Sequence, residues 1–167
     1  MDTVKEIILD LKLAIESFTN LIDQDIGVGI GEHSQAFIDT NDIVVGIYAT
    51  LFRNNVVDLA HEQYYKANDF NYRDYNINYE TFVLLHEIGH LQTVPTKKEY
   101  KQYLKAEKKI NKSKVSDYEK SLAYWTLEIE QNADKWAMQY LMTNIGAVQE
   151  LDFIIHALKN KLIKALN

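Results

Sequence analysis

The segment of residues 81–91 constrains the fold of this chain most, because it is apolar on nearly every side and yet carries the pentapeptide His86-Glu87-Ile88-Gly89-His90. A helix that is apolar all round is buried, and polar groups in a buried helix need partners. Histidines four residues apart project from one face of a helix, where both imidazoles can bind a single divalent metal ion. The segment therefore predicts either a metal site or a core helix whose histidines hydrogen-bond to backbone carbonyl groups.

Glu87 gives the pentapeptide a chemical use beyond metal binding. It directly follows His86, so it stands beside the metal-binding face and can take a proton from a metal-bound water. A catalytic zinc usually has three protein ligands and keeps a fourth position for water or substrate. The chain contains no cysteine, so the third ligand has to be a histidine or an acidic residue. Thr96 stands where a metzincin would have its third histidine, which excludes that class.

A carboxylate in a later helical segment is the candidate for the third ligand. Glu130 and Asp134 are four residues apart, so a helix places them on one face. Glu130 can supply an oxygen to the metal, and Asp134 can accept the free ring N–H of a ligand histidine and so fix its tautomer. Glu128 is the rival ligand, but it points away from that face. The alternative is that Glu130 and Asp134 are solvent-facing charges on an amphipathic helix.

The two segments together resemble the gluzincin branch of the zincin metallopeptidases. They are most similar to the ImmA/IrrE-type family of small intracellular and phage-associated peptidases. Trp136 stands where that family commonly has phenylalanine, and a lysine-rich insertion makes the spacing between the two segments long. The family pattern that the second segment keeps comprises Glu130, Ala133, Asp134, Ala137 and Leu141.

This resemblance implies a zincin-like fold in which His86, His90 and Glu130 hold one zinc ion (Zn2+) per chain. Glu87 is then the general base of peptide-bond hydrolysis, and Asp134 supports a ligand histidine. The implied partner is a protein or peptide substrate, such as a regulator or repressor. A zincin scaffold that binds metal and a partner without turnover is the alternative function, and a metal-free helical interaction protein is the third.

The oxyanion of such a reaction needs a hydrogen-bond donor. Tyr124 precedes Glu130 by six residues, nearly two helical turns, and is the candidate donor. Tyr118 and His156 are the alternatives. The competing interpretation of Tyr124 is a packing residue, since buried tyrosines are common.

The hydrophobic pattern predicts an α+β fold that is mostly helical and forms a single domain over residues 1–167. Asn78 is the expected N-cap of the helix that carries His86 and His90. Ser116 opens a long helix through a capping box, and Gly146 closes it in the left-handed conformation. The further helices are expected over residues 3–22, 97–112, 117–144 and 148–166.

A small antiparallel sheet is expected before the histidine helix. Residues 36–38 and 43–48 read as strands that flank a turn at residues 39–42, and the edge near residues 43–48 is where an extended substrate would pair. Residues 49–66 form a third strand or a helix from about Val56. Residues 23–31 read as a break, and residues 64–79 as a loop with its aromatic residues on the surface.

Charge is unevenly distributed along the chain. The net charge is −6, but residues 97–120 hold nine of the sixteen lysines against four acidic residues. An acidic protein is a poor nucleic-acid binder, and the lysine-rich segment 97–114 is either a solvated helix or a contact surface. The chain start lacks the basic region of a signal peptide, and no apolar run approaches a membrane span. A cytoplasmic protein without membrane contact is therefore expected.

Overall fold

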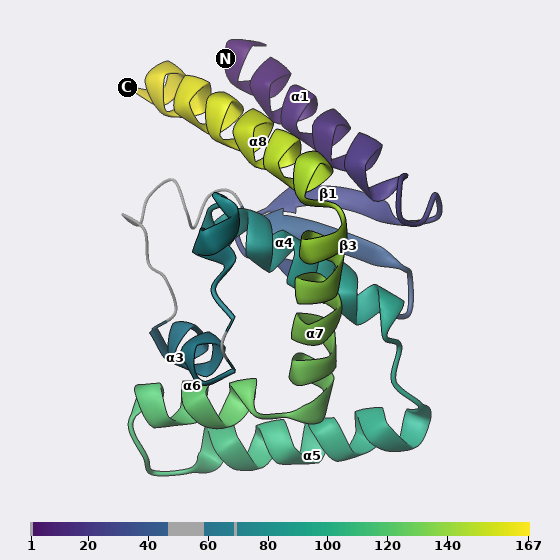
Figure 1. The fold of residues 1–167 in the computed structure, drawn as a ribbon, viewed down its shortest axis with the longest axis vertical. Helices are drawn as coiled ribbons and strands as arrows, with labels where there is room; N and C mark the ends of the chain where they lie inside the picture. Colours follow the sequence, from purple (N-terminus) through teal and green to yellow (C-terminus); the bar gives the residue numbers. More distant parts are fainter. Residues whose placement is uncertain (1, 47–58, 69) are drawn as a thin grey trace.

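A computed structural model describes residues 2–46, 59–68 and 70–167. It is mostly helical with one small sheet, as expected for the α+β class (Figure 1). None of the helices in these ranges is both long and apolar enough to cross a membrane. The elements in chain order are α1 (Asp2–Thr19), β1 (Gly27–Gly31), β2 (Gln35–Phe37), β3 (Asp42–Gly46), α3 (Leu59–Ala67), the 3-10 helix η1 (Tyr72–Tyr75), α4 (Tyr79–Gln92), α5 (Lys97–Lys112), α6 (Asp117–Trp125), α7 (Glu128–Thr143) and α8 (Ile145–Leu166).

The sheet is mixed and has the order β1-β3-β2, so the prediction of an antiparallel sheet was wrong in part. The expected hairpin exists, because β2 pairs antiparallel with β3. The residues interpreted as a break contain β1, which pairs parallel with β3 in the register Val28 to Ile43. Glycines are depleted in strands, so the three glycines of β1 concealed it. Because β3 is the central strand, residues 43–46 are not a free edge.

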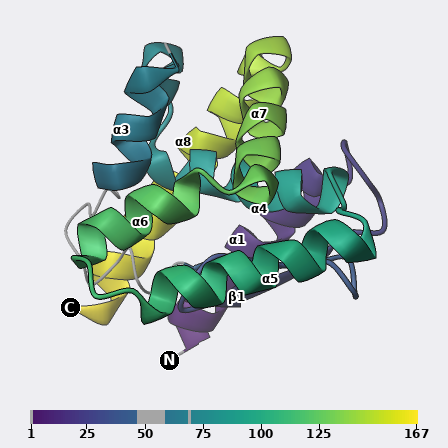
Figure 2. The ribbon, with the colours of Figure 1, turned by 90° about the horizontal axis from the view of Figure 1, so that it is seen from below.

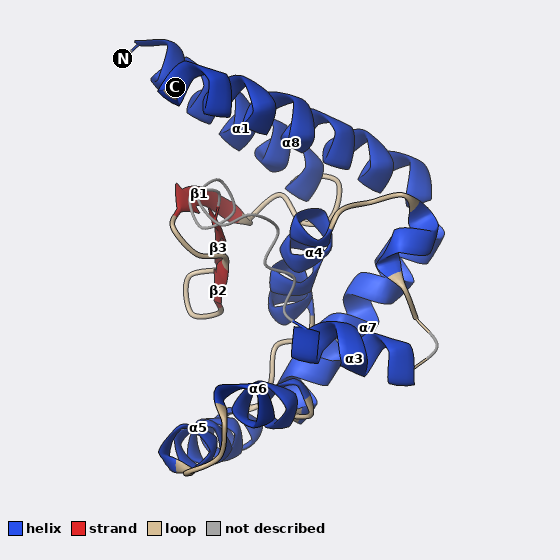
Figure 3. Ribbon diagram, turned by 90° about the vertical axis from the view of Figure 1, so that its left-hand side faces the viewer, coloured by secondary structure: helices blue, strands red, loops and turns tan. Residues whose placement is uncertain are grey.

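Helices α1 and α8 form one layer, in which the two chain termini lie at the same end (Figure 1). Their shared face is apolar, as helical periodicity in α1 predicted. Leu11, Ile15 and Leu162 are almost fully buried there, and α1 also packs on β1. The apolar core continues from this layer into the buried residues of α4, which lies on the same side of α1 and α8 as the sheet (Figure 3).

The long helix expected over residues 117–144 is two helices, α6 and α7. The Ser116 capping box does begin α6, but that helix ends at Trp125. The hydroxyl of Thr126 donates to the carbonyl oxygen of Ala123 at 2.6 Å, a local bond that competes with helix continuation. Leu127 then adopts an extended conformation and begins α7. The break lets α6 run beside α5 and α3 instead of extending away from them (Figure 2).

Three smaller predictions also change. Gly146 lies in the first turn of α8 and no described glycine has a positive φ, so α7 ends without a left-handed glycine. The segment 64–79 contains the end of α3 and all of η1, and Tyr72 is 2% exposed, so its aromatic residues are not all on the surface. The helix expected from Val56 is present from Leu59, and residues 47–58 lie outside the described residues.

Candidate metal centre

Helix α4 is fixed at its N-terminus by α8. Asn78 occupies the N-cap position, but its side chain does not cap the helix. Its backbone N–H and its side-chain amide instead donate to the Asp152 carboxylate at 2.9 and 3.0 Å, and the Thr81 hydroxyl donates to the same carboxylate at 2.5 Å. The first turn of α4 is therefore held by an acidic side chain that also complements its unpaired N–H groups.

Helix α7 lies very close to α4 at Gly89. A Cβ atom at this position would lie 2.5 Å from the carbonyl oxygen of Ala133, so no larger residue fits without a shift of backbone. Ala133 and Ala137 are fully buried at the same interface. These small residues permit the helix contact that brings the polar side chains of the two helices together.

The three expected metal ligands converge across this interface. Nε2 of His86 and Nε2 of His90 lie 3.1 and 3.2 Å from the same oxygen, Oε2 of Glu130. Their ligand atoms all lie within 4.8 Å of one another, a grouping that could hold a metal ion. Asp134 is also placed as expected, with Oδ1 2.8 Å from Nδ1 of His86. His86, Glu130 and Asp134 are buried, which rules out the solvent-facing alternative for the two carboxylates.

The charges in this cluster shift one another's pKa. Burial would lower the pKa of His86, but hydrogen bonds with Asp134 and Glu130 raise it to about 10. Burial would raise the pKa of Glu130, yet hydrogen bonds from His86 and His90 outweigh burial and hold it well below its ordinary value. Asp134 behaves in the same way: burial is outweighed by hydrogen bonds from His61 and His86, and its pKa is lowered. Both carboxylates are therefore ionised, as ligands of a cation should be.

Glu87 lines a cavity of about 870 Å³. Residues of β2 and α5 also line this cavity, together with His90 and Glu130. Burial raises the pKa of Glu87, the two histidines oppose this rise, and a hydrogen bond from the Ala36 backbone also lowers the pKa. The carboxylate that the sequence assigned to proton transfer thus faces open space beside the candidate ligands.

Two of the tyrosines that line the cavity lie close to Glu130, and the sequence identified only one of them. Tyr124 lines the cavity as expected, but Tyr103 of α5 makes the direct contact, donating its hydroxyl proton to Oε1 of Glu130 at 2.9 Å. The two hydroxyl oxygens lie 3.4 Å apart. Burial, followed by the charge of Glu130, raises the pKa of both phenols, so each keeps its proton. Tyr103 lies in the lysine-rich segment, 27 residues before Glu130, and no spacing in the sequence linked the two.

The other candidates lie elsewhere. The hydroxyl of Tyr118 hydrogen-bonds to Gln63, and Tyr118 is exposed. Nε2 of His156 is 3.6 Å from Glu80 at the start of α4, on α8 and apart from the candidate ligands. Neither side chain lines the cavity that contains Glu87.

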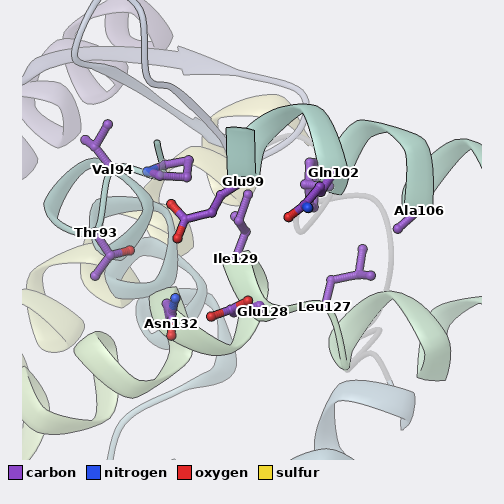
Figure 4. Close-up of a pocket in the computed structure, with 11 residues that line it drawn as sticks. Thr93, Val94, Glu99, Gln102, Ala106, Leu127, Glu128, Ile129 and Asn132 are labelled. Carbon is purple, nitrogen blue, oxygen red and sulfur yellow. The ribbon is translucent and has the colours of Figure 1, made fainter. Parts of the chain in front are cut away.

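Glu128 lines a second, smaller cavity of about 420 Å³ next to the first. Figure 4 shows its carboxylate and that of Glu99 directed into the space between α5 and α7. Glu128 is exposed and is not among the residues that converge on His86, so it does not compete with Glu130 as a ligand.

His61 is the buried polar residue that the sequence did not reveal. It lies on α3, is fully buried, and its Nε2 is 2.9 Å from Oδ2 of Asp134. Hydrogen bonds connect it through Asp134 and then His86 to Glu130. A lone histidine in a segment without clear periodicity carries no signal for such a contact, and His61 is 73 residues from Asp134 in the chain.

Comparison of the chain with family models, with curated proteins and with solved structures found no match.

Proposed function

We propose that this protein is a zinc-dependent peptidase with a zincin-like active site. One observation carries the proposal: His86, His90 and Glu130 converge on one point, and Glu87 lies beside them at an open cavity. Two imidazole nitrogens and one carboxylate oxygen are the donor set of a catalytic zinc site, and they leave a coordination position free. The resemblance of the two segments to the ImmA/IrrE-type peptidases supports the same assignment.

The residues have distinct tasks in this proposal. A zinc ion held by the three ligands would supply Lewis acidity, which activates water and polarises a carbonyl group at neutral pH. Glu87 accepts the proton of the attacking water and returns it to the leaving amine. Tyr103 and Tyr124 keep their protons and line the cavity. Tyr103 donates its proton to Glu130, so Tyr124 is the candidate donor to the developing oxyanion.

An extended peptide would lie along β2. In the described part of the chain β2 pairs only with β3, and residues 34–37 line the cavity. Backbone hydrogen bonds to a sheet edge are a common way to bind a peptide chain. A substrate of this kind places its scissile carbonyl between β2 and α5, above Glu87. We expect a protein substrate in the cytoplasm, with a regulator or repressor suggested by the resemblance.

The test is Glu87→Gln in protein loaded with one equivalent of zinc. We expect unchanged zinc binding and a loss of peptide cleavage, because the amide cannot accept the proton. Cleavage is read by mass spectrometry as new N-termini in a proteome-derived peptide library. Glu128→Gln is the matched control, since Glu128 is exposed and stands apart from the candidate ligands. Equal cleavage by Glu87→Gln and the unmodified protein would contradict the proposed role of Glu87. If the protein is instead a binding protein without turnover, neither form will cleave the library, and both will bind the partner equally.

A further inference from the structure

His61 is a histidine in the protein interior whose two ring nitrogens both have partners. It is fully buried, as is Asp134. Nδ1 of His61 lies 2.9 Å from the hydroxyl oxygen of Tyr79, and Nε2 lies 2.9 and 3.1 Å from the two carboxylate oxygens of Asp134. Asp134 in turn is 2.8 Å from Nδ1 of His86. A continuous chain of hydrogen bonds therefore runs from α3 to a candidate metal ligand.

The chemistry of Asp134 fixes the direction of these bonds. An ionised carboxylate only accepts hydrogen bonds, so both histidines donate to it. Nε2–H of His61 and Nδ1–H of His86 are then the donors, and Nδ1 of His61 shares a hydrogen bond with the hydroxyl of Tyr79. With a metal ion bound, this arrangement would leave the lone pair on Nε2 of His86 for the metal. In the metal-free protein the same nitrogen carries a proton and donates to Glu130.

Trp125 holds the plane of the His61 ring. The two rings are stacked, with centroids 3.4 Å apart and an interplanar angle of 6°. The same indole lies edge-on to His86, with centroids 5.4 Å apart. Trp125 is the last residue of α6. The helix break at Thr126, which the sequence did not predict, therefore ends α6 at the residue that packs on both histidines.

We propose that His61 is a positioning residue of the metal centre, which holds Asp134 in the orientation that directs Nε2 of His86 at the metal ion. Asp134 without His61 has one fewer buried donor and can rotate away from His86. Interactions behind a metal ligand typically change metal affinity by about 10- to 100-fold. The inference rests on the proposed metal centre but does not require that the protein hydrolyses peptides.

The same atoms suggest a rival arrangement. His61, His86 and Asp134 also offer ligand atoms within 4.8 Å of one another, so a second ion could replace the hydrogen bonds. To bind that ion, His61 would have to lose the proton on Nε2 and His86 the proton on Nδ1. His86 would then bridge two metal ions as an imidazolate. Metal stoichiometry separates the two arrangements.

The experiment measures zinc affinity by competition with a chromophoric chelator, together with the visible spectrum of the cobalt(II) form. His61→Phe keeps an aromatic ring against Trp125 and removes the donor, and we expect zinc binding about 10- to 100-fold weaker with an altered cobalt spectrum. His61→Gln restores an N–H donor and should recover a large part of the affinity. Tyr79→Phe leaves His61 in place and should weaken zinc binding by a smaller factor. This variant tests the series of hydrogen bonds even if His61→Phe does not fold.

The outcomes are distinct. Equal zinc affinity in the unmodified protein and a folded His61→Phe would overturn the positioning role and leave the three-ligand site intact. Two zinc ions per chain, of which His61→Phe loses one, would make His61 a ligand instead. An unmodified protein that takes up no zinc would overturn the metal centre and this inference together, whereas inactivity of a zinc-bound protein would affect only the proposed peptidase function.

Discussion

The α1–α8 pair and the α4–α7 pair are both buried helix contacts, but they are built from different chemistry. Leu11, Ile15 and Leu162 in the first pair are apolar and almost fully buried. The second pair encloses His86 and Glu130, whose burial costs free energy unless each polar atom finds a partner. The first pair needs only the right side-chain volume. The second requires a particular arrangement of donors and acceptors, and such an arrangement is what a metal site provides.

Truncation of the apolar pair should have the largest effect on stability. Leu162→Ala removes a fully buried side chain, and we expect the free energy of unfolding to fall by about 2–5 kcal/mol. Denaturant titration measures this loss. Leu166→Ala, on the same helix but exposed, is the control and should change little. Zinc affinity should be the same in all three proteins. A parallel loss of zinc binding would show that the two helix pairs do not act separately.

The metal-free α4–α7 pair should lose stability at both ends of the pH range. The pKa of His86 is raised to about 10, so its contribution is fully present below its ordinary value and is lost as pH rises through 10. The pKa of Glu130 is lowered, so its contribution is present above the ordinary carboxylate range and is lost as pH falls through that range. We expect changes of the order of a few kcal/mol, measured as unfolding free energy in chelator. A flat profile from pH 7 to 10 would contradict the ion pairing of His86.

The close contact of α4 with α7 at Gly89 should be sensitive to any added side chain. Gly89→Ala adds a Cβ against the Ala133 carbonyl, and overpacking of this kind costs about 1–3 kcal/mol. Because α4 and α7 must separate, zinc affinity should fall as well. Gly146→Ala is the control: nothing lies within 4 Å of its added Cβ, so a helical alanine should be neutral or stabilising there. Equal thermal midpoints for the two variants would show that the helix contact tolerates expansion.

Asp134→Asn keeps the shape of the polar cluster and alters only its charge and one acceptor. We expect zinc affinity to fall by about 10- to 100-fold while the fold persists. Isothermal titration with zinc and a far-ultraviolet circular dichroism spectrum give the two readings. Asn132→Ala, on the same helix and lining the smaller cavity, should bind zinc normally. Unchanged zinc affinity in Asp134→Asn would mean that His86 does not need a carboxylate hydrogen-bonded to its Nδ1 in order to bind the metal.

Substitutions on the exposed side of α5 should have the smallest effects on stability and zinc binding. Tyr103 contacts Glu130, whereas Lys105 and Lys109 are exposed on the same helix. Lys105→Gln and Lys109→Gln should change stability by less than about 0.5 kcal/mol and leave zinc binding unchanged. Tyr103→Phe should weaken zinc binding, because it removes the hydrogen bond that orients Glu130. A strong effect of the lysine changes on cleavage would instead make this face a contact surface for the substrate.

Features encoded locally were predictable from the sequence. Helical periodicity predicted α1, and the capping residue Ser116 marked the start of α6. The four-residue spacing of Glu130 and Asp134 predicted that both carboxylates share one helix face, and the structure turns that face toward His86. In each case the information lay within a few adjacent residues.

Features that depend on distant contacts were not predictable. β1 was missed because its glycines carry little strand preference and its stability comes from pairing with β3. His61 and Tyr103 reach the site from α3 and α5, at sequence separations of 73 residues from Asp134 and 27 from Glu130. No periodic pattern relates positions so far apart, and only the folded arrangement of helices brings them together.

Zinc content is the most direct test of the central claim that α4 and α7 together form a metal site. Mass spectrometry on protein purified without a metal-affinity tag should find about one zinc per chain. His86→Ala and Glu130→Ala should lose it, and Glu128→Ala should retain it. An unmodified protein that contains no zinc, even after zinc is added, would contradict the account and leave the buried polar cluster without a metal to explain it.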